Sequence, residues 1–272
     1  MLEADKAFSG SIPQNYDRWM VPLIFEPYAQ DMARRVAALG PGAVLETAAG
    51  SGVVTRVLAP LLAPGARYVA TDLNQAMLDY AASRQPEGSG IAWQRADALA
   101  LPFEDGAFDV VCCQFGAMFF PDRVTGYREA RRVLRPGGRF VFSVWDRIEA
   151  NAFAEEATRT LGEIFPDDPP LFMARTPHGY HDRTLIAREL AEAGFAPVTI
   201  ETRAEESRAA SARIPAMAYC QGTLLRNEIE ARDAHGLAAA TERVAAAIAA
   251  RHGKGAVSAP IQAHIVEAVA PE

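Results

Sequence analysis

Residues 43–52, with the sequence AVLETAAGSG, constrain the fold of this chain more than any other stretch. A short apolar run ends in the acid Glu46, and a turn of small residues follows before an apolar helical pattern begins at Val53. This order predicts a strand, a tight glycine turn and a helix. Gly50 and Gly52 lack a Cβ and can adopt positive φ, so backbone amides of the turn can approach a ligand at the carboxyl edge of a sheet. We therefore expect a nucleotide-like cofactor.

A second acid, Asp72, directly follows the next predicted strand, residues 67–71, and lies 20 positions beyond Gly52. In a βαβ unit this distance brings the end of the second strand beside the glycine turn, where a carboxylate can accept hydrogen bonds from both ribose hydroxyls. A GxG pattern alone is weak. Its signal becomes stronger here because a strand precedes it, a helix follows it and Asp72 stands at the expected distance.

The first half of the chain continues to alternate between predicted strands and helices. Further helices are expected over 53–62, 73–84 and 123–134, and further strands over 91–95, 108–113 and 139–145. Asp97 follows the 91–95 strand and would therefore meet the same crevice, where its carboxylate could accept a hydrogen bond from the exocyclic amine of an adenine. The alternative is that Asp97 is a turn or helix-capping acid.

Composition narrows the functional classes. The 272 residues are 50% hydrophobic, enough for one large α/β domain or for a domain with an inserted cap. The formal net charge of -7 argues against nucleic acid as the substrate. Three cysteines without metal spacing, an acidic first segment and the lack of any membrane-length apolar run predict a cytoplasmic protein with no metal and no membrane span.

Five ordered segments resemble one family. They are LETAAGSG at 45–52, TDLNQAML at 71–78, RADALALPF at 95–103, FDVV at 108–111 and RRVLRPGGRFVFSVWD at 131–146. Together they look like the class I S-adenosylmethionine-dependent methyltransferases, nearest to the branch that includes the ubiquinone and menaquinone biosynthesis enzymes. The resemblance covers residues 8–146. The family has an acid and then three glycines at alternate positions, and this chain has Ala48 in place of the first glycine.

The resemblance implies a Rossmann-like, doubly wound, mostly parallel seven-stranded α/β sheet with an antiparallel last strand and a helical cap inserted before it. It implies S-adenosylmethionine as the cofactor and S-adenosylhomocysteine as the product. Asp72 would bind the ribose, Leu73 would lie on the adenine face, and Asp97 with Ala98 would meet the adenine edge. The remaining implied cofactor residues are Tyr16, Glu46, Ala48, Gly50, Gly52, Met77 and Gln114.

The domain organisation is expected to be a single methyltransferase domain, residues 1–272. Its parts would be an N-terminal lid and helix (1–40), a cofactor-binding core (41–146), the second half of the sheet with a partial cap (147–210), a helical cap insertion (211–255) and a closing strand (256–272). Within the lid, residues 8–20 contain many turn formers and read as a loop. The last two strands are expected over 195–202 and 261–269, paired antiparallel.

The second half holds one cluster of titratable and aromatic side chains, at His178, Tyr180, His181 and Asp182. A histidine near its ordinary pKa could accept a proton during methyl transfer, so His178 and His181 are the candidate catalytic residues. The favoured alternative is structural: Asp182 would cap a helix over 184–193.

We therefore expect methyl transfer to a small-molecule acceptor, with oxygen or an activated carbon ahead of nitrogen and sulfur. The partly apolar cap favours an aromatic, quinone-like or lipid-like compound. Two alternatives stay open: an NAD-dependent oxidoreductase, which also needs a glycine turn and a ribose-binding acid, and a non-catalytic S-adenosylmethionine-binding protein. The oligomeric state is open, a homodimer included.

Overall fold

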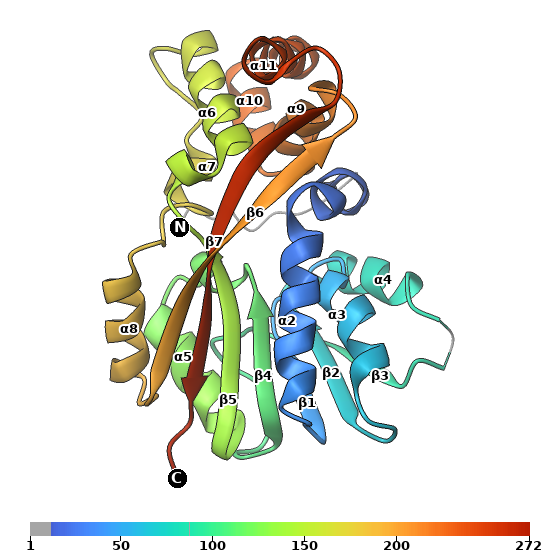
Figure 1. Cartoon of the computed structure of the whole chain (residues 1–272), viewed down its shortest axis with the longest axis vertical. Coiled ribbons are helices and arrows are strands. Elements are labelled where there is room, and N and C mark those ends of the chain that lie inside the picture. The colour runs from blue at the N-terminus through green and yellow to red at the C-terminus, as the bar shows by residue number, and fades with distance from the viewer. Residues whose placement is uncertain (1–11, 87) are drawn as a thin grey trace. The chain divides into compact units, whose positions relative to one another are not determined.

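The computed structural model describes residues 12–86 and 88–272, which form a seven-stranded sheet with helices (Figure 1). The strands are β1 (Ala43–Glu46), β2 (Arg67–Asp72), β3 (Ile91–Arg95), β4 (Phe108–Gln114), β5 (Leu134–Trp145), β6 (Val198–Ala209) and β7 (Val257–Val269). The α-helices are α1 (Ile12–Asn15), α2 (Glu26–Ala38), α3 (Val53–Leu58), α4 (Gln75–Ser83), α5 (Arg123–Val133), α6 (Ala152–Ile164), α7 (Phe172–Arg175), α8 (Arg183–Glu192), α9 (Arg213–Gly222), α10 (Leu225–Arg232) and α11 (Leu237–His252). A π-helix, η2 (Tyr16–Phe25), and three short 3₁₀ turns, η3 (Ala59–Leu61), η4 (Ala117–Phe119) and η5 (Ile148–Ala150), complete the description.

The order of the strands is β3-β2-β1-β4-β5-β7-β6, and β1 to β5 pair in parallel. β7 runs antiparallel to β5, because Ala270 N bonds to Gly138 O near one end of the pair while Asp146 N bonds to Gln262 O near the other. The expected Rossmann-like sheet with an antiparallel last strand is therefore confirmed. β1 lies inside the sheet, which puts the glycine turn beside the carboxyl ends of β2 and β4.

By its internal contacts the chain divides into two compact units. The first comprises residues 1–26, 145–180 and 204–262, and the second comprises 27–144, 181–203 and 263–272. In the first unit, α9 packs against η2, α6 and α11. In the second unit, the sheet from β1 to β5 carries helices, and β6 and β7 each contribute residues to both units.

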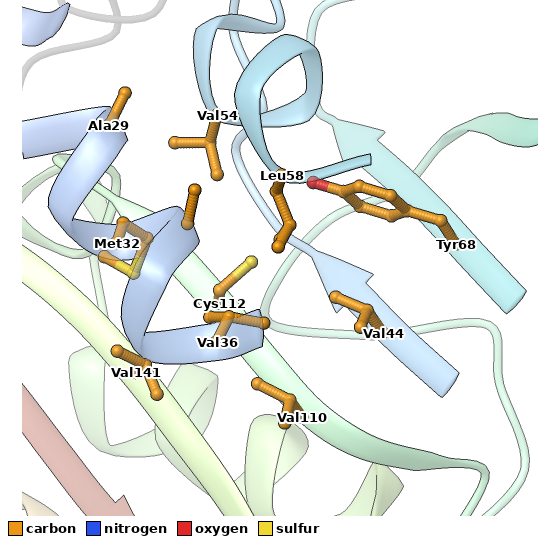
Figure 2. Packing of buried hydrophobic residues seen from close by; sticks show 11 residues of the cluster. Ala29, Met32, Val36, Val44, Val54, Leu58, Tyr68, Val110, Cys112 and Val141 are labelled. Atoms are coloured by element: carbon orange, nitrogen blue, oxygen red, sulfur yellow. The ribbon is translucent and has the colours of Figure 1, made fainter. Parts of the chain in front are cut away.

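The core of the second unit explains why the strands form. Apolar side chains from α2 and α3 pack on one face of β1, β2, β4 and β5 (Figure 2). On β5, Val141 belongs to this face, whereas Phe140 and Phe142 contact Tyr127 of α5 on the other. Period-two alternation therefore gives the strand two apolar faces, as a sheet covered by helices on both sides requires.

Two local expectations were wrong. Residues 12–20 are helical, not a loop, because η2 buries an apolar run from Met20 to Phe25 that supports the helix despite the turn formers before it. The strand expected over 139–145 does not include residues 135–138, yet they belong to β5, where the pairing with β4 shifts in register between Phe108 and Val110. β6 begins three residues later than expected and runs to Ala209, and β7 begins four residues earlier, at Val257.

Candidate cofactor-binding site

The glycine turn after β1 adopts an unusual backbone conformation. Gly50 and Gly52 have φ of 56° and 76°, and Ala48, between them and the strand, has φ of 52°. A left-handed conformation costs a residue with a Cβ on the order of 1–2 kcal/mol, which explains why the family favours glycine where this chain has Ala48. Beyond the position of a Cβ on Gly50, only the Met77 methyl lies within 4 Å. The turn therefore presents accessible backbone at Gly50.

Asp72 lies directly beside this turn. Its Oδ2 accepts a hydrogen bond from Gly50 N at 2.9 Å, and its Oδ1 accepts one from Asn74 N at 2.8 Å. Burial raises the pKa of Asp72, and the amides of Asn74 and Gly50 oppose that rise. A carboxylate oxygen can accept more than one hydrogen bond, so both oxygens retain acceptor capacity for ligand hydroxyls. Asp72 thus links the glycine turn to the end of β2 through a hydrogen bond.

Around Asp72, three further expected residues follow the ends of β2 and β3. Leu73 directly follows Asp72, and its side chain is 44% exposed. The end of β3 joins the edge because Ala96 N bonds to Asp72 O at 3.1 Å, and the half-buried Ala98 follows. Asp97 is exposed and accepts a hydrogen bond from Leu99 N at 2.9 Å. Asp97 therefore acts as a turn acid, and its contact with adenine stays a prediction.

The loop after β4 packs on the glycine turn. A Cβ on Gly116 would lie 2.5 Å from Ala48 Cβ, so the two loops are in close contact. Phe115, next to the half-buried Gln114, has φ of 53°, a second non-glycine residue in the left-handed region. Strained backbone of this kind clusters at ligand sites and switch regions.

The residues present fit a nucleoside-bearing cofactor. Within the part of the chain that the structure describes, Ser51 Oγ in the glycine turn is buried at 1% exposure and has no hydrogen-bond partner. A buried hydroxyl without a partner is costly, and a bound ligand or water would relieve that cost. Together with open backbone at Gly50, the exposed Leu73 and the acceptor capacity of Asp72, this favours a sugar and a flat base at this edge.

Glu46, expected to line the cofactor, has a buried side chain, and its contact with the cofactor stays a prediction. Its side chain is 2% exposed and accepts hydrogen bonds from Thr55 Oγ1 and Tyr68 Oη, two residues that the sequence analysis did not single out. The signal was present, because the period-two pattern of β2 places Tyr68 on the same face as Asp72, and Thr55 is a polar residue within the apolar start of α3. Burial raises the pKa of Glu46 to about 7, and the two hydroxyls lower it only in part.

The residues of the expected cluster at 178–182 have different surroundings. His178 is buried in the first unit, where its Nδ1 lies 2.8 Å from the carbonyl oxygen of Asp146. His181 belongs to the second unit. Asp182 caps α8 by accepting hydrogen bonds from Thr184 N and Leu185 N, so the structural interpretation of that acid is confirmed.

Tyr16 lies in the first unit, where its ring stacks on Phe25 at 5.0 Å. Its expected contact with the cofactor stays a prediction. Among residues 12–86 and 88–272, no group of three His, Cys, Asp or Glu side chains could hold a metal ion. Over the same residues, no helix has both the length and the apolar character needed to cross a membrane.

Comparison with known proteins identifies the family. Residues 45–142 match a family described as a methyltransferase domain. A demethylmenaquinone methyltransferase from Mycobacterium sp. (strain KMS) is 35% identical over 170 residues, which cover 59% of this chain and 70% of that protein. A ubiquinone/menaquinone biosynthesis C-methyltransferase from Hahella chejuensis is 38% identical over 101 residues, covering 36% of this chain and 41% of that protein.

The fold is shared with solved methyltransferases. The structure of phosphoethanolamine N-methyltransferase 2 from Haemonchus contortus, in complex with phosphomonomethylethanolamine and S-adenosylhomocysteine, superimposes with a TM-score of 0.62 at 16% identity. The superposition covers 100% of this chain and 61% of that one. With the sheet order, the glycine turn and the relatives all in agreement, the chain belongs to the class I S-adenosylmethionine-dependent methyltransferases, near the ubiquinone and menaquinone biosynthesis branch.

Proposed function

We propose that this enzyme methylates a carbon or an oxygen of a small aromatic or quinone-like acceptor. The observation that carries the proposal is the 35% identity to a demethylmenaquinone methyltransferase over 170 residues. The second named relative is a C-methyltransferase, which favours carbon as the acceptor atom. The lack of a strongly basic composition supports a small molecule over a nucleic acid.

On the cofactor side, Asp72 would accept hydrogen bonds from the ribose hydroxyls, Leu73 and Met77 would pack on the base, and Asp97 with Ala98 would meet its edge. Glycine-turn residues Ala48, Gly50 and Gly52, together with Gln114, would line the methionine portion. When bound, S-adenosylmethionine supplies a methyl group on a positively charged sulfur, which is already electrophilic. The contribution of the protein is then chiefly to hold the acceptor atom in line with the methyl group, and such positioning can remove several kcal/mol from a barrier.

For the acceptor, the relevant feature of the first unit is a row of four rings in successive contact. Tyr16 stacks on Phe25, Phe25 lies 5.8 Å from Trp145, and Trp145 lies 6.1 Å from His178, measured between ring centroids. Aromatic rings of this kind suit a flat apolar acceptor. We propose on this basis that these rings contact the acceptor.

His178 is the better of the two candidate bases. A carbonyl oxygen can only accept, so Nδ1 of His178 must donate to Asp146 O, and Nε2 then carries the lone pair in the neutral ring. Asn151 holds this loop, because its Nδ2 donates to the carbonyl oxygens of Asp146 and Arg147. As the methyl group is transferred, a ring carbon or hydroxyl acceptor loses a proton, and Nε2 of His178 would take it, an effect on the order of 10²–10⁴-fold in rate.

The cofactor assignment is tested with Asp72→Ala and calorimetric titration of S-adenosylhomocysteine. We expect at least tenfold weaker binding, because the ribose hydroxyls lose their acceptor. Asp79→Ala, an exposed acid on the neighbouring helix, is the matched control and should bind as the parent does. Unchanged affinity in Asp72→Ala, or tighter binding of NAD than of S-adenosylhomocysteine, contradicts the proposed site.

The acceptor is tested by offering the enzyme labelled S-adenosylmethionine with panels of reduced quinones, phenols, amines and thiols, and by locating the methyl group with mass spectrometry. We expect transfer to a quinol ring carbon or a phenolic oxygen. His178→Gln should lower that turnover while S-adenosylhomocysteine affinity stays at the parent value, and His181→Ala should leave both unchanged. Transfer to amines alone would refute the acceptor class, and binding without turnover across all panels would favour a non-catalytic protein.

A further inference from the structure

Two hydroxyl groups converge on one carboxyl oxygen directly below the glycine turn. Thr55 Oγ1 donates to Glu46 Oε2 at 2.6 Å, and Tyr68 Oη donates to the same oxygen at 2.5 Å. All three side chains are buried. Buried polar side chains are stable only when their polar atoms are hydrogen-bonded, and these three side chains satisfy one another. We call Glu46, Thr55 and Tyr68 together the Glu46 clamp.

The Glu46 clamp joins the two ends of the glycine turn, where we propose that the cofactor binds. Glu46 is the last residue of β1 and Thr55 lies in the first turn of α3, so their hydrogen bond joins the two ends of the turn at residues 47–52. Tyr68 adds β2 to this connection. Val44 pairs with Tyr68, and the alternation of side chains along strands places Glu46 on the same face of the sheet as Tyr68.

Further hydrogen bonds connect the Glu46 clamp to the residues proposed to face the cofactor. Thr71 Oγ1 donates to Glu46 O at 3.0 Å, and Ala49 N donates to Thr71 O at 2.9 Å. Gly50 N then bonds to Asp72 Oδ2. The turn is therefore fixed at its start, at its middle and at its end.

The turn needs such support because three of its residues hold positive φ. Conformations of this kind persist only where the surrounding structure enforces them. We propose that Glu46, Thr55 and Tyr68 are positioning residues for the methyl donor: they set the backbone of the glycine turn from the buried side and do not themselves touch the cofactor. The proposal rests on the assignment of the cofactor to Asp72 and the glycine turn, and it replaces the expectation that Glu46 lines the cofactor.

The test compares Tyr68→Phe, Thr55→Val, Glu46→Gln and Glu46→Leu. We expect S-adenosylhomocysteine affinity to fall at least tenfold in Glu46→Leu and at least threefold in Tyr68→Phe and Thr55→Val. KM for S-adenosylmethionine should rise by similar factors, with kcat at saturating cofactor within threefold of the parent. Glu46→Gln should bind within threefold of the parent, because its amide oxygen can still accept from both hydroxyls.

Val54→Ala controls for a general loss of stability, since Val54 is buried in the same helix and makes no hydrogen bond to the turn through its side chain. It should lower the melting temperature while cofactor affinity stays at the parent value. Two results would overturn the proposal. One is parent-like affinity in Tyr68→Phe, Thr55→Val and Glu46→Leu. The other is a fall in S-adenosylhomocysteine affinity in Glu46→Gln as large as in Asp72→Ala, while Tyr68→Phe binds as the parent does. That result would mean that Glu46 contacts the cofactor directly.

The proposed cofactor site and the clamp can fail separately. If Asp72→Ala also binds S-adenosylhomocysteine as the parent does, the cofactor site itself is misplaced. If Asp72→Ala loses affinity and the clamp variants do not, the site stands and the clamp is refuted.

Discussion

At the scale of single residues, Glu46 shows how burial and hydrogen bonding oppose each other. Desolvation raises its pKa from an ordinary 4.5 to about 7, although two hydroxyls donate to the carboxyl group. Between these two pH values the folded protein keeps a proton that the unfolded chain releases. Stability therefore falls as pH rises through this window, since the folded state binds more protons than the unfolded state.

We expect Glu46→Gln to remove this dependence. At pH 4.5 the free energies of unfolding of Glu46→Gln and the parent should be similar, because both side chains are neutral in the folded protein. At pH 8 the variant should be more stable than the parent by on the order of 3 kcal/mol. Urea unfolding of both proteins at several pH values measures the difference. An exposed acid, Glu149, supplies the control as Glu149→Gln, whose stability should follow the parent at every pH. A parent-to-variant difference that does not change with pH would show that Glu46 ionises normally.

Ala48 and Gly116 illustrate a second effect, steric contact between loops. A Cβ on Gly116 would lie 2.5 Å from Ala48 Cβ and 2.7 Å from Cys113 Sγ. We expect Gly116→Ala to destabilise the protein by about 1–3 kcal/mol, because overpacking forces neighbouring groups apart. Adding Ala48→Gly should restore part of that loss, since one of the two clashes disappears. Denaturant unfolding of the single and double variants measures the coupling, and strictly additive effects would argue against contact between these loops.

At the scale of elements, helix starts follow rules that are local in sequence. Asn74, Asp122 and Asp182 each precede a helix, and each side chain accepts a hydrogen bond from a backbone amide in the first turn. These caps satisfy donors that the helix cannot pair internally. This explains why the boundaries of α4, α5 and α8 could be placed from sequence to within two residues.

Asp182→Ala tests the structural role of the cluster at residues 178–182. We expect a loss of about 1 kcal/mol in stability, typical of a removed cap, with kcat and KM unchanged. Asp122→Ala removes the matching cap of α5 and should behave alike. Thermal unfolding and steady-state kinetics on both variants separate the two roles. Reduced turnover in Asp182→Ala at parent stability would return this acid to the list of catalytic candidates.

The helical segment at residues 12–25 shows where local rules fail. The turn formers up to Met20 predicted a loop, yet the segment forms α1 and η2, with Pro22 inside the π-helix. The apolar residues from Met20 to Phe25 are buried, and Ser207 Oγ on β6 donates to Leu23 O. Burial against a distant part of the chain outweighed the local preference, as tertiary contacts often do.

At the scale of the whole molecule, the proposed cofactor residues and the candidate acceptor residues belong to different compact units. The second unit contains the glycine turn, Asp72 and the clamp, whereas the first contains Tyr16, Trp145 and His178. Each unit has its own buried core, since α2 and α3 cover the sheet in the second while α9 packs with α6 and α11 in the first.

Hydrogen exchange can test the proposed cofactor residues and the proposed acceptor residues in turn. On addition of S-adenosylhomocysteine, we expect the largest new protection at residues 43–52, 71–74 and 95–99, because bound ligand slows the local opening of these loops. A reduced quinone added afterwards should extend protection to segments of the first unit around residues 16–25, 145–151 and 178. Protection confined to the first unit when S-adenosylhomocysteine is added alone would contradict the cofactor assignment.

The sequence by itself determined the Rossmann-like sheet, the glycine turn after β1 and the position of Asp72 beside that turn. These features depend on short-range physics: the period of apolar residues, the tolerance of glycine for positive φ, and the spacing that places Asp72 beside Gly50. Only the tertiary structure decided which polar side chains meet. Glu46, Thr55 and Tyr68 come from two strands and a helix, and their convergence depends on strand register and side-chain direction. Sequence spacing does not encode these contacts directly, because each requires the folded sheet to exist first.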